Sequence, residues 1–326
     1  MKFYQVLLFV NIALLFFPYL SFGQEFDFGK LSSPIIFEGN YKFAYRDPAV
    51  IYHDGTFHLY FTLVERASDK GMYLFLAKSK SSDLIHWTYP RLLTPRDRNL
   101  NYSSPGNIIR FNDEWIICLQ TYPTPNNETW GNASSRIWIM RSKDLENWSE
   151  PEILMIKGDD VSIPEMGRMI DPYLLEDGNE PGKWWCYYKQ NGVSMSYAYD
   201  LKGWQFAGSA NSGENVTVLF KNGEYILFHS PENGIGIKRS KSPEKWGEDE
   251  ALITLGQDDW YWAKRRLTAA TVIDLTDNPL FGKYIMFFHG SSEEGAKPFY
   301  NAHNNASLGI AWSDDLITWE WPGKTN

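Results

Sequence analysis

Five copies of a short turn pattern, Asp-Leu-x-x-Trp or a close variant, recur along this chain of 326 residues. Four copies occupy residues 83–87, 144–148, 200–204 and 315–319, and a degenerate copy, Ser-Pro-Glu-Lys-Trp, occupies 242–246. Their tryptophans lie 42 to 73 residues apart, which is close to the length of one four-stranded propeller blade with its loops. The repeat predicts an all-β protein, a five-bladed β-propeller with four antiparallel strands in each blade.

The segments between these turns support the same fold. Runs of β-branched and aromatic residues are separated by hairpin signals such as Asp54-Gly55 and Asn222-Gly223. Helical periodicity is absent over any useful length. We therefore expect residues 24–326 to form a single propeller domain.

The first 23 residues resemble a secretory signal peptide. Lys2 provides a positive start, residues 6–15 form an apolar run interrupted by Asn11, and Ser21-Phe22-Gly23 provides a small-x-small cleavage pattern. No later segment is apolar enough to span a bilayer. We expect an exported protein, periplasmic or secreted, whose oligomeric state the sequence leaves open.

Composition excludes some partners. The chain carries 31 basic and 40 acidic residues, a net charge of −9, whereas nucleic-acid binding needs clustered Lys and Arg. The two cysteines, Cys118 and Cys186, lie in apolar strand runs, which favours free buried thiols, with a disulfide as the alternative. Because no metal-ligand spacing is present, we expect no cofactor. A structural divalent cation in the channel has no support from the sequence.

A polar ring is predicted at one mouth of the propeller. In each blade, the start of the first strand and the end of the second strand lie at the same mouth. The predicted starts are Asp47, Pro105, Asp171, Asn215 and approximately Thr268. The predicted ends are Thr62, Gln120, Lys189, His229 and His289. Polar and ionisable side chains converging on one opening are typical of a binding site.

Two Asp-Pro pairs stand out at this mouth. Asp47 and Asp171 each precede a proline at equivalent places in blades one and three, and proline favours an extended backbone in the residue before it. Two carboxyl groups facing one cavity suit inverting glycoside hydrolysis, in which a base activates water and an acid protonates the leaving oxygen. Arg46 beside Asp47 would help to keep that carboxylate ionised.

These features resemble the five-bladed propeller glycoside hydrolases of the family 43 type, the arabinosidases and xylosidases, over essentially the whole mature chain. The resemblance implies that Asp47 is the general base. Because Ser104-Pro105 stands at the start of blade two, the site pattern looks more like glycoside hydrolase family 117, the anhydro-galactosidases. That resemblance implies a catalytic set of Asp47, Asp171 and His229, with His229 as the acid.

Other residues are candidates for the site. Glu165, six residues before Asp171, is the alternative acid, and His289 is placed like His229 but in blade five. Arg266, in the basic run 264–266, could bind a uronate or sulfate group. Loop tryptophans could stack on a sugar ring; these are Trp130, Trp260 and Trp262.

The sequence thus predicts an exo-acting glycoside hydrolase that releases a terminal sugar from an oligo- or polysaccharide with inversion. Asp47 would be the base, Asp171 would position the sugar and tune the acid, and His229 would be the acid. The predicted substrate-binding residues are Arg46, Gln120, Glu165, Lys189, Arg266 and His289. A non-catalytic glycan-binding propeller is the alternative, and the sugar itself stays open.

Overall fold

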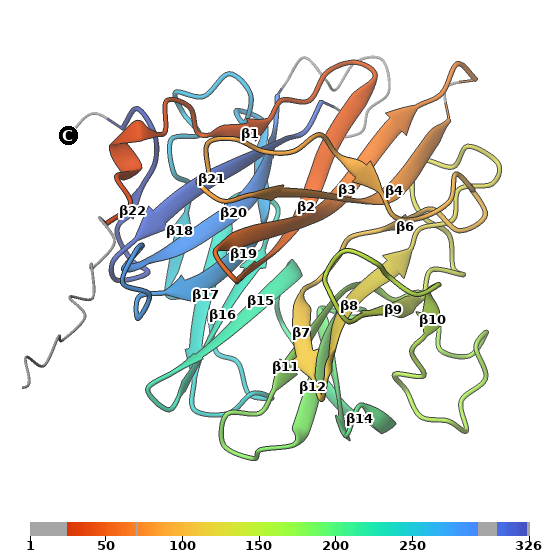
Figure 1. The fold of residues 1–326 in the computed structure, drawn as a ribbon. Coiled ribbons are helices and arrows are strands. Elements are labelled where there is room, and N and C mark those ends of the chain that lie inside the picture. Colours follow the sequence, from red (N-terminus) through yellow and green to blue (C-terminus); the bar gives the residue numbers. More distant parts are fainter. Residues whose placement is uncertain (1–24, 70, 293–304, 325–326) are drawn as a thin grey trace, which may run out of the picture.

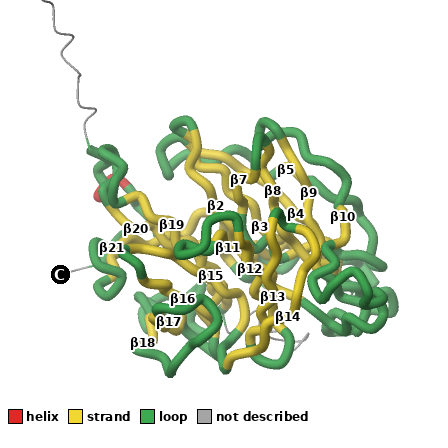
Figure 2. The backbone as a smooth tube through the Cα atoms, turned by 90° about the horizontal axis from the view of Figure 1, so that it is seen from below, coloured by secondary structure: helices red, strands yellow, loops and turns green. Residues whose placement is uncertain are grey.

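The computed structural model describes residues 25–69, 71–292 and 305–324. Five antiparallel sheets make up this part of the chain, and the helical element found there is a single turn, η1 (Phe28–Lys30). Figure 1 shows the sheets arranged around a common centre, and Figure 2 shows how fully strands and loops dominate the backbone. The predicted five-bladed β-propeller is confirmed. The predicted signal peptide lies outside the described residues.

Blades one to three follow the chain in order. Blade one contains β2 (Phe43–His53), β3 (Thr56–Arg66), β4 (Met72–Ser81) and β5 (Arg91–Leu92). The innermost strand of blade two is interrupted; the blade contains β6 (Tyr102–Ser103), β7 (Ile108–Phe111), β8 (Glu114–Thr121), β9 (Ile137–Ser142) and β10 (Glu152–Ile153). Blade three contains β11 (Ile170–Glu176), β12 (Lys183–Lys189), β13 (Val193–Tyr199) and β14 (Lys202–Ala210).

The last two blades complete the ring. Blade four contains β15 (Glu214–Lys221), β16 (Glu224–Ser230), β17 (Ile235–Ser240) and β18 (Ala251–Ile253). Blade five contains β19 (Arg266–Leu275), β20 (Lys283–Ser291), β21 (Ser307–Ser313) and β22 (Trp319–Glu320). The early strand β1 (Ile35–Phe37) pairs antiparallel with β21, so residues near the start of the chain join the last blade. Figure 1 shows the red β1 beside the blue β21. This pairing closes the ring between blades five and one.

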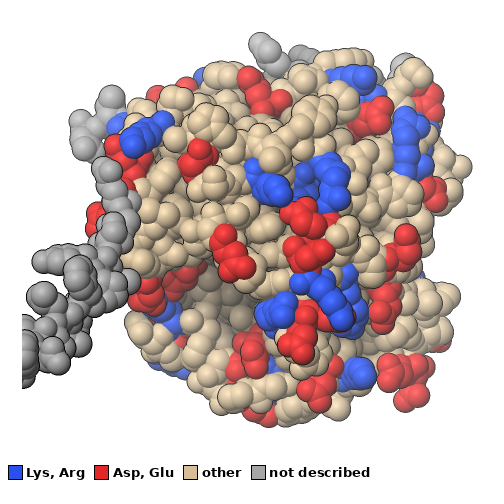
Figure 3. All heavy atoms as spheres, viewed as in Figure 1, with Lys and Arg blue, Asp and Glu red and all other residues tan. Residues whose placement is uncertain are grey.

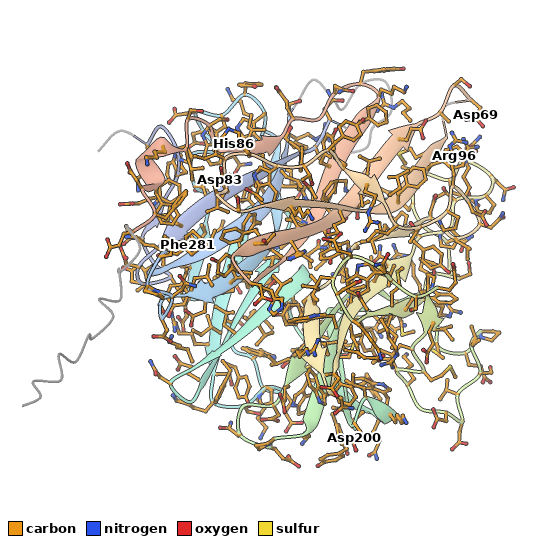
Figure 4. The ribbon with its side chains drawn as sticks, viewed as in Figure 1. Asp69, Asp83, His86, Arg96, Asp200 and Phe281 are labelled. Atoms are coloured by element: carbon orange, nitrogen blue, oxygen red, sulfur yellow. The ribbon has the colours of Figure 1, made fainter. Side chains whose placement is uncertain are left out.

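Three of the repeated Asp-Leu-x-x-Trp turns, those that begin at Asp83, Asp144 and Asp315, have a common local structure. In the first copy, Oδ1 of Asp83 accepts hydrogen bonds from the backbone N–H groups of Ile85 and His86 at 3.0 and 2.8 Å. Leu84, which lies between Asp83 and Ile85, adopts a positive φ of 59° and is buried. Figure 4 shows Asp83 and His86 next to each other, and Nδ1 of His86 lies 2.8 Å from Oδ2 of Asp83. The Asp83 carboxylate therefore accepts hydrogen bonds from backbone N–H groups that have no strand partner at the turn.

The same turns connect neighbouring blades. Leu145, the turn leucine of blade two, presents its carbonyl to the hydroxyl of Tyr60 in blade one at 2.9 Å. In the degenerate copy, the carbonyl of Pro243 accepts from Tyr187 of blade three at 2.7 Å. Buried tyrosines thus place aromatic area between blades and satisfy their hydroxyl groups on the next turn. At these two blade interfaces, the repeated turn therefore helps to hold neighbouring blades together.

The cysteines and the surface agree with the sequence analysis. Cys118 and Cys186 are free and buried, as predicted. Acidic and basic side chains intermingle on the face seen in Figure 3. No helix in the described ranges is long and apolar enough to cross a membrane.

Candidate active site

Each blade has one residue in the left-handed region on its innermost strand or, in blade two, in the interruption of that strand between β6 and β7. These residues are Asp47, Ser104, Asp171, Asn215 and Ala269, with φ between 45° and 52°. In four blades the strand register shifts at this residue, as expected for a β-bulge. The expectation of an extended backbone at Asp47 and Asp171 is therefore wrong, because the bulge outweighs the preference that the following proline imposes. The predicted starts Pro105 and Thr268 are each one residue away from the true equivalents, Ser104 and Ala269.

Side chains at the ends of the second strands hold these bulges in place across the blade interfaces. Thr62 Oγ1 accepts from Ser104 N–H at 2.7 Å, and Gln120 Oε1 accepts from Asp171 N–H at 2.6 Å. The two remaining contacts of this kind join Ser230 Oγ to Ala269 N–H at 2.7 Å and His289 Nδ1 to Asp47 N–H at 3.1 Å. At four of the five blade interfaces, or joints, a side chain of the preceding blade thus accepts a hydrogen bond from the left-handed residue of the next blade. The fifth joint, between blades three and four, has Lys189 in this place.

The two predicted aspartates lie together at the axis. Asp47 and Asp171 are 6% and 8% exposed, and both line the same pocket. Thr62 Oγ1 donates to Oδ2 of Asp47 at 2.9 Å, and Ser104 Oγ donates to Oδ1 of Asp171 at 2.7 Å. Because Ser104 N–H also donates to Thr62 Oγ1, three hydrogen bonds link the two carboxyl groups. This chain fixes both groups relative to each other.

The environment shifts the proton affinity of both aspartates. Burial raises the pKa of Asp47, while the nearby Arg46 and the Thr62 hydrogen bond act in the opposite direction. Arg46 Nε lies 3.9 Å from Oδ2 of Asp47. Burial, and then the negative charges of Glu214 and Asp47, raise the pKa of Asp171 to about 7. The carboxyl group of Asp171 can therefore hold a proton near neutral pH.

A pocket of about 130 Å³ opens above the aspartates. Its polar wall includes Arg46, Gln120 and Lys189, as predicted from the sequence, and adds a carboxyl group that the sequence analysis missed, Glu214. Glu214 is 28% exposed, and its Oε1 lies 2.8 Å from Nη2 of Arg266. The remaining lining residues are Leu74, Ser103, Tyr122, Trp130, Arg168, Ile170 and Asn215. The mouth therefore brings together three carboxyl groups, from blades one, three and four.

A smaller cavity of about 20 Å³ lies along the axis next to this pocket. Both aspartates, Ser104 and Asn215 line it together with apolar residues from the five inner strands. A polar cavity of this size can hold one water molecule. Water can therefore be held in contact with the carboxyl groups from the axial side.

A family comparison assigns this architecture. Residues 37–220 match the profile of the glycosyl hydrolases family 32 N-terminal domain. The chain belongs to this family. The match begins at the last residue of β1, ends within β15, and includes Asp47, Asp171 and Glu214. No curated protein matches the chain.

Solved structures confirm the family 43-like propeller fold of this glycosyl hydrolase family member. An exo-1,5-α-L-arabinanase from a bovine ruminal metagenomic library is 16% identical, with a TM-score of 0.60, over 88% of this chain and all of that chain (100%). A thermostable family-43 glycoside hydrolase is 15% identical, with a TM-score of 0.57, over 91% and 97%. The Bombyx mori family 32 β-fructofuranosidase is 16% identical, with a TM-score of 0.57, over 84% of this chain and 63% of its own. The closer likeness to family 117 stays a prediction.

Within this family member, His229 is not among the residues that line the pocket. Its Nδ1 accepts from Gly213 N–H at 2.9 Å, and its Nε2 lies 2.7 Å from Oδ1 of Asp249. A Cβ at Gly236 would come within 2.4 Å of Nε2, so the ring packs directly over that glycine. Burial lowers the pKa of His229, although Asp249 acts in the opposite direction. A buried histidine with both nitrogens engaged has a structural environment, which does not suit the predicted acid role.

The other sequence candidates divide between the pocket and its surroundings. Glu165 is exposed and bonds to the hydroxyl of Ser162 at 2.6 Å, and it does not line the pocket. His289 is 1% exposed beneath Asp47, where it holds the backbone of that residue. Among the loop tryptophans, Trp130 lines the pocket and is 53% exposed, whereas Trp260 and Trp262 stack on Phe288. No metal-binding cluster of His, Cys, Asp or Glu is found in the part of the chain that the structure describes.

Proposed function

We propose that this family member is an exported, exo-acting glycoside hydrolase that releases a terminal sugar from an oligo- or polysaccharide with inversion. The observation that carries the proposal is the group of three carboxyl groups at the floor and wall of one pocket. A volume of about 130 Å³ lies below the range typical of sites for drug-sized ligands, about 300–1,000 Å³. This size supports the capture of one terminal ring rather than the middle of a chain.

Asp47 is the general base in this mechanism. Burial raises the pKa of Asp47, and Arg46 and Thr62 counteract this by favouring the ionised form. The axial cavity offers room for a water molecule beside the carboxyl group. Asp47 would take a proton from the attacking water as that water adds to the anomeric carbon. Asp171 would hold the sugar and control the proton affinity of the cluster.

Glu214 replaces His229 as our proposed general acid. It is the most exposed of the three carboxyl groups, so it can reach a glycosidic oxygen that the buried aspartates cannot. The ion pair with Arg266 uses Oε1, which leaves Oε2 for the substrate. As the general acid, Glu214 would donate a proton to the leaving glycosidic oxygen while the bond from that oxygen to the anomeric carbon breaks.

The alternative is a non-catalytic glycan-binding propeller. The observation that favours it is Ser104, which occupies the blade-two place in the ring and carries no ionisable group. The fold cannot decide between the two functions, because propellers support many of them.

The experiment is monosaccharide release from a glycan panel by the wild type and by Asp47→Asn. The panel contains arabinan, xylo-oligosaccharides, agar and carrageenan oligosaccharides, and pectin and ulvan fragments. Release by the wild type that is lost in the variant supports the hydrolase, and the anomer first seen by NMR tests inversion. Binding without release from any glycan would favour the alternative.

A further inference from the structure

Lys189 departs from the pattern of the interface ring, the set of side chains at the blade interfaces formed by Thr62, Gln120, Lys189, Ser230 and His289. Thr62, Gln120, Ser230 and His289 each accept a hydrogen bond from the left-handed residue of the next blade. Lys189 pairs with Ile170 at the corresponding place in blade three, but an ammonium group has no acceptor. The N–H of Asn215 therefore has no side-chain acceptor of the kind found at the other four joints. A cation at this place suggests a role other than joining the blades.

Arg168 lies on the neighbouring segment of the same pocket wall. The carboxamide of Gln190, next to Lys189, donates to the carbonyl of Arg168 at 3.0 Å, which ties the two segments together. Nε of Arg168 donates to the carbonyl of Gly131 at 3.0 Å. The guanidinium carbon lies 5.6 Å from the ring centre of Tyr122. One nitrogen and one face of the guanidinium are thus engaged, which fixes its orientation before any ligand binds.

The pocket is lined by three cations and three carboxyl groups, but these charges are unevenly paired. Arg46 lies beside Asp47, and Arg266 pairs with Glu214. No ion pair of Arg168 or Lys189 is found among the described residues, although both line the pocket. Covering these two cations with a neutral sugar would remove water from them without providing a counter-charge. An anionic group would instead form charge-assisted hydrogen bonds with both.

We propose that the pocket recognises a terminal sugar that carries an anionic substituent, a carboxylate or a sulfate ester, bound between Lys189 and Arg168. This inference rests on the proposed function, because it names the class of substrate that the proposed active site would bind. Trp130 on the same wall offers an exposed ring face for the sugar. The anion side of the pocket is formed by blades two and three, while the acid side at Glu214 belongs to blade four.

The test measures binding and turnover separately. Calorimetry with Asp47→Asn compares galacturonate, glucuronate and 6-sulfated galactose with galactose and glucose. The wild type is assayed on oligosaccharides that end in the same sugars. We expect at least one anionic sugar to bind about 10- to 100-fold more tightly than its neutral counterpart, the range for a hydrogen bond to a charged group. Comparing galacturonate and glucuronate with 6-sulfated galactose distinguishes a preference for a carboxylate from a preference for a sulfate ester.

Lys189→Gln is the decisive variant. Glutamine provides the acceptor that Gln120 provides in blade two, so the fold should keep or gain thermal stability while one positive charge is lost. The preference for the anionic sugar should fall about 10-fold or more, and Arg168→Gln should act in the same direction. Lys202→Gln, at an exposed place on β14, is the matched control and should leave the preference unchanged.

The outcomes separate the two proposals. Equal binding of anionic and neutral sugars, or an unchanged preference in Lys189→Gln, overturns the anionic-sugar inference and leaves the hydrolase proposal standing. A lowered melting temperature with an unchanged preference would identify Lys189 as a structural residue, with the same consequence. Anionic binding by Asp47→Asn without any release by the wild type supports the inference and contradicts the hydrolase.

Discussion

Replacing Asp171 by asparagine should change how the stability of the protein depends on pH. The wild-type carboxyl is 8% exposed and its pKa is raised from 3.8 to about 7, mainly by burial. A carboxyl whose pKa is higher in the folded state binds its proton more tightly there than in the unfolded chain. The stability it contributes is fully present below about pH 4, the unfolded pKa, and is lost progressively as the pH rises to about 7.

The magnitude follows from the shift. About three pKa units at 1.36 kcal/mol each correspond to a loss of about 4 kcal/mol from the free energy of unfolding between pH 4 and pH 8. Asparagine has nearly the same shape and accepts the Ser104 hydrogen bond, but it carries no charge. The variant should therefore match the wild type near pH 4 and be more stable by about 4 kcal/mol at pH 8.

Urea unfolding followed by tryptophan fluorescence measures this difference at pH 4, 5, 6, 7 and 8. Asp200→Asn, at an exposed turn position, is the control for the loss of one surface carboxylate. A difference between the wild type and Asp171→Asn that stays constant across this range would refute the reasoning. It would mean that the Asp171 carboxyl is not held protonated by burial.

Further substitutions test the surroundings of the site. Ser104→Ala removes a hydrogen bond that lowers the pKa of Asp171 in the folded protein, so the upper end of the pH range over which stability is lost should move upward by about one unit or more. An unmoved upper end would contradict the contact. Thr62→Val leaves Ser104 N–H without its acceptor and should lower stability by about 1–3 kcal/mol in urea, whereas an unchanged midpoint would argue against the interface ring. Because Cys118 and Cys186 are free thiols, a reductant should leave the melting temperature unchanged, and a reductant-dependent fall would show a disulfide.

The fold could be predicted because its signal is local and repeated. In three of the copies the aspartate accepts hydrogen bonds from the backbone of its own turn, so the pattern survives even where the rest of the blade differs. Asp47 and Asp171 could be found for the same reason, since two Asp-Pro pairs mark equivalent places. Their left-handed backbone could not be predicted, because the bulge depends on hydrogen bonds from the preceding blade.

Glu214, our proposed acid, shows the limit of an alignment based on turns. Successive side chains in a strand point to opposite faces, so a shift of one residue exchanges pocket and core. His229 was aligned with the ends of the other second strands, but Ser230, which pairs with Glu214, is the true equivalent. Glu214 comes directly before the axial Asn215, as Arg46 comes before Asp47. Inspecting the residue before each axial position would have identified it.

The central claim is that Asp47, Asp171 and Glu214 form a catalytic cluster, and comparing kcat for Glu214→Gln and His229→Gln tests it most directly. The assay uses the substrate that the glycan panel identifies and includes a matched substrate with an activated leaving group. The account predicts that Glu214→Gln lowers kcat on the natural leaving group by about 10²–10⁴-fold. It also predicts a smaller loss on the activated substrate and a largely retained kcat in folded His229→Gln. A retained kcat in Glu214→Gln, with the loss in His229→Gln instead, would contradict the account.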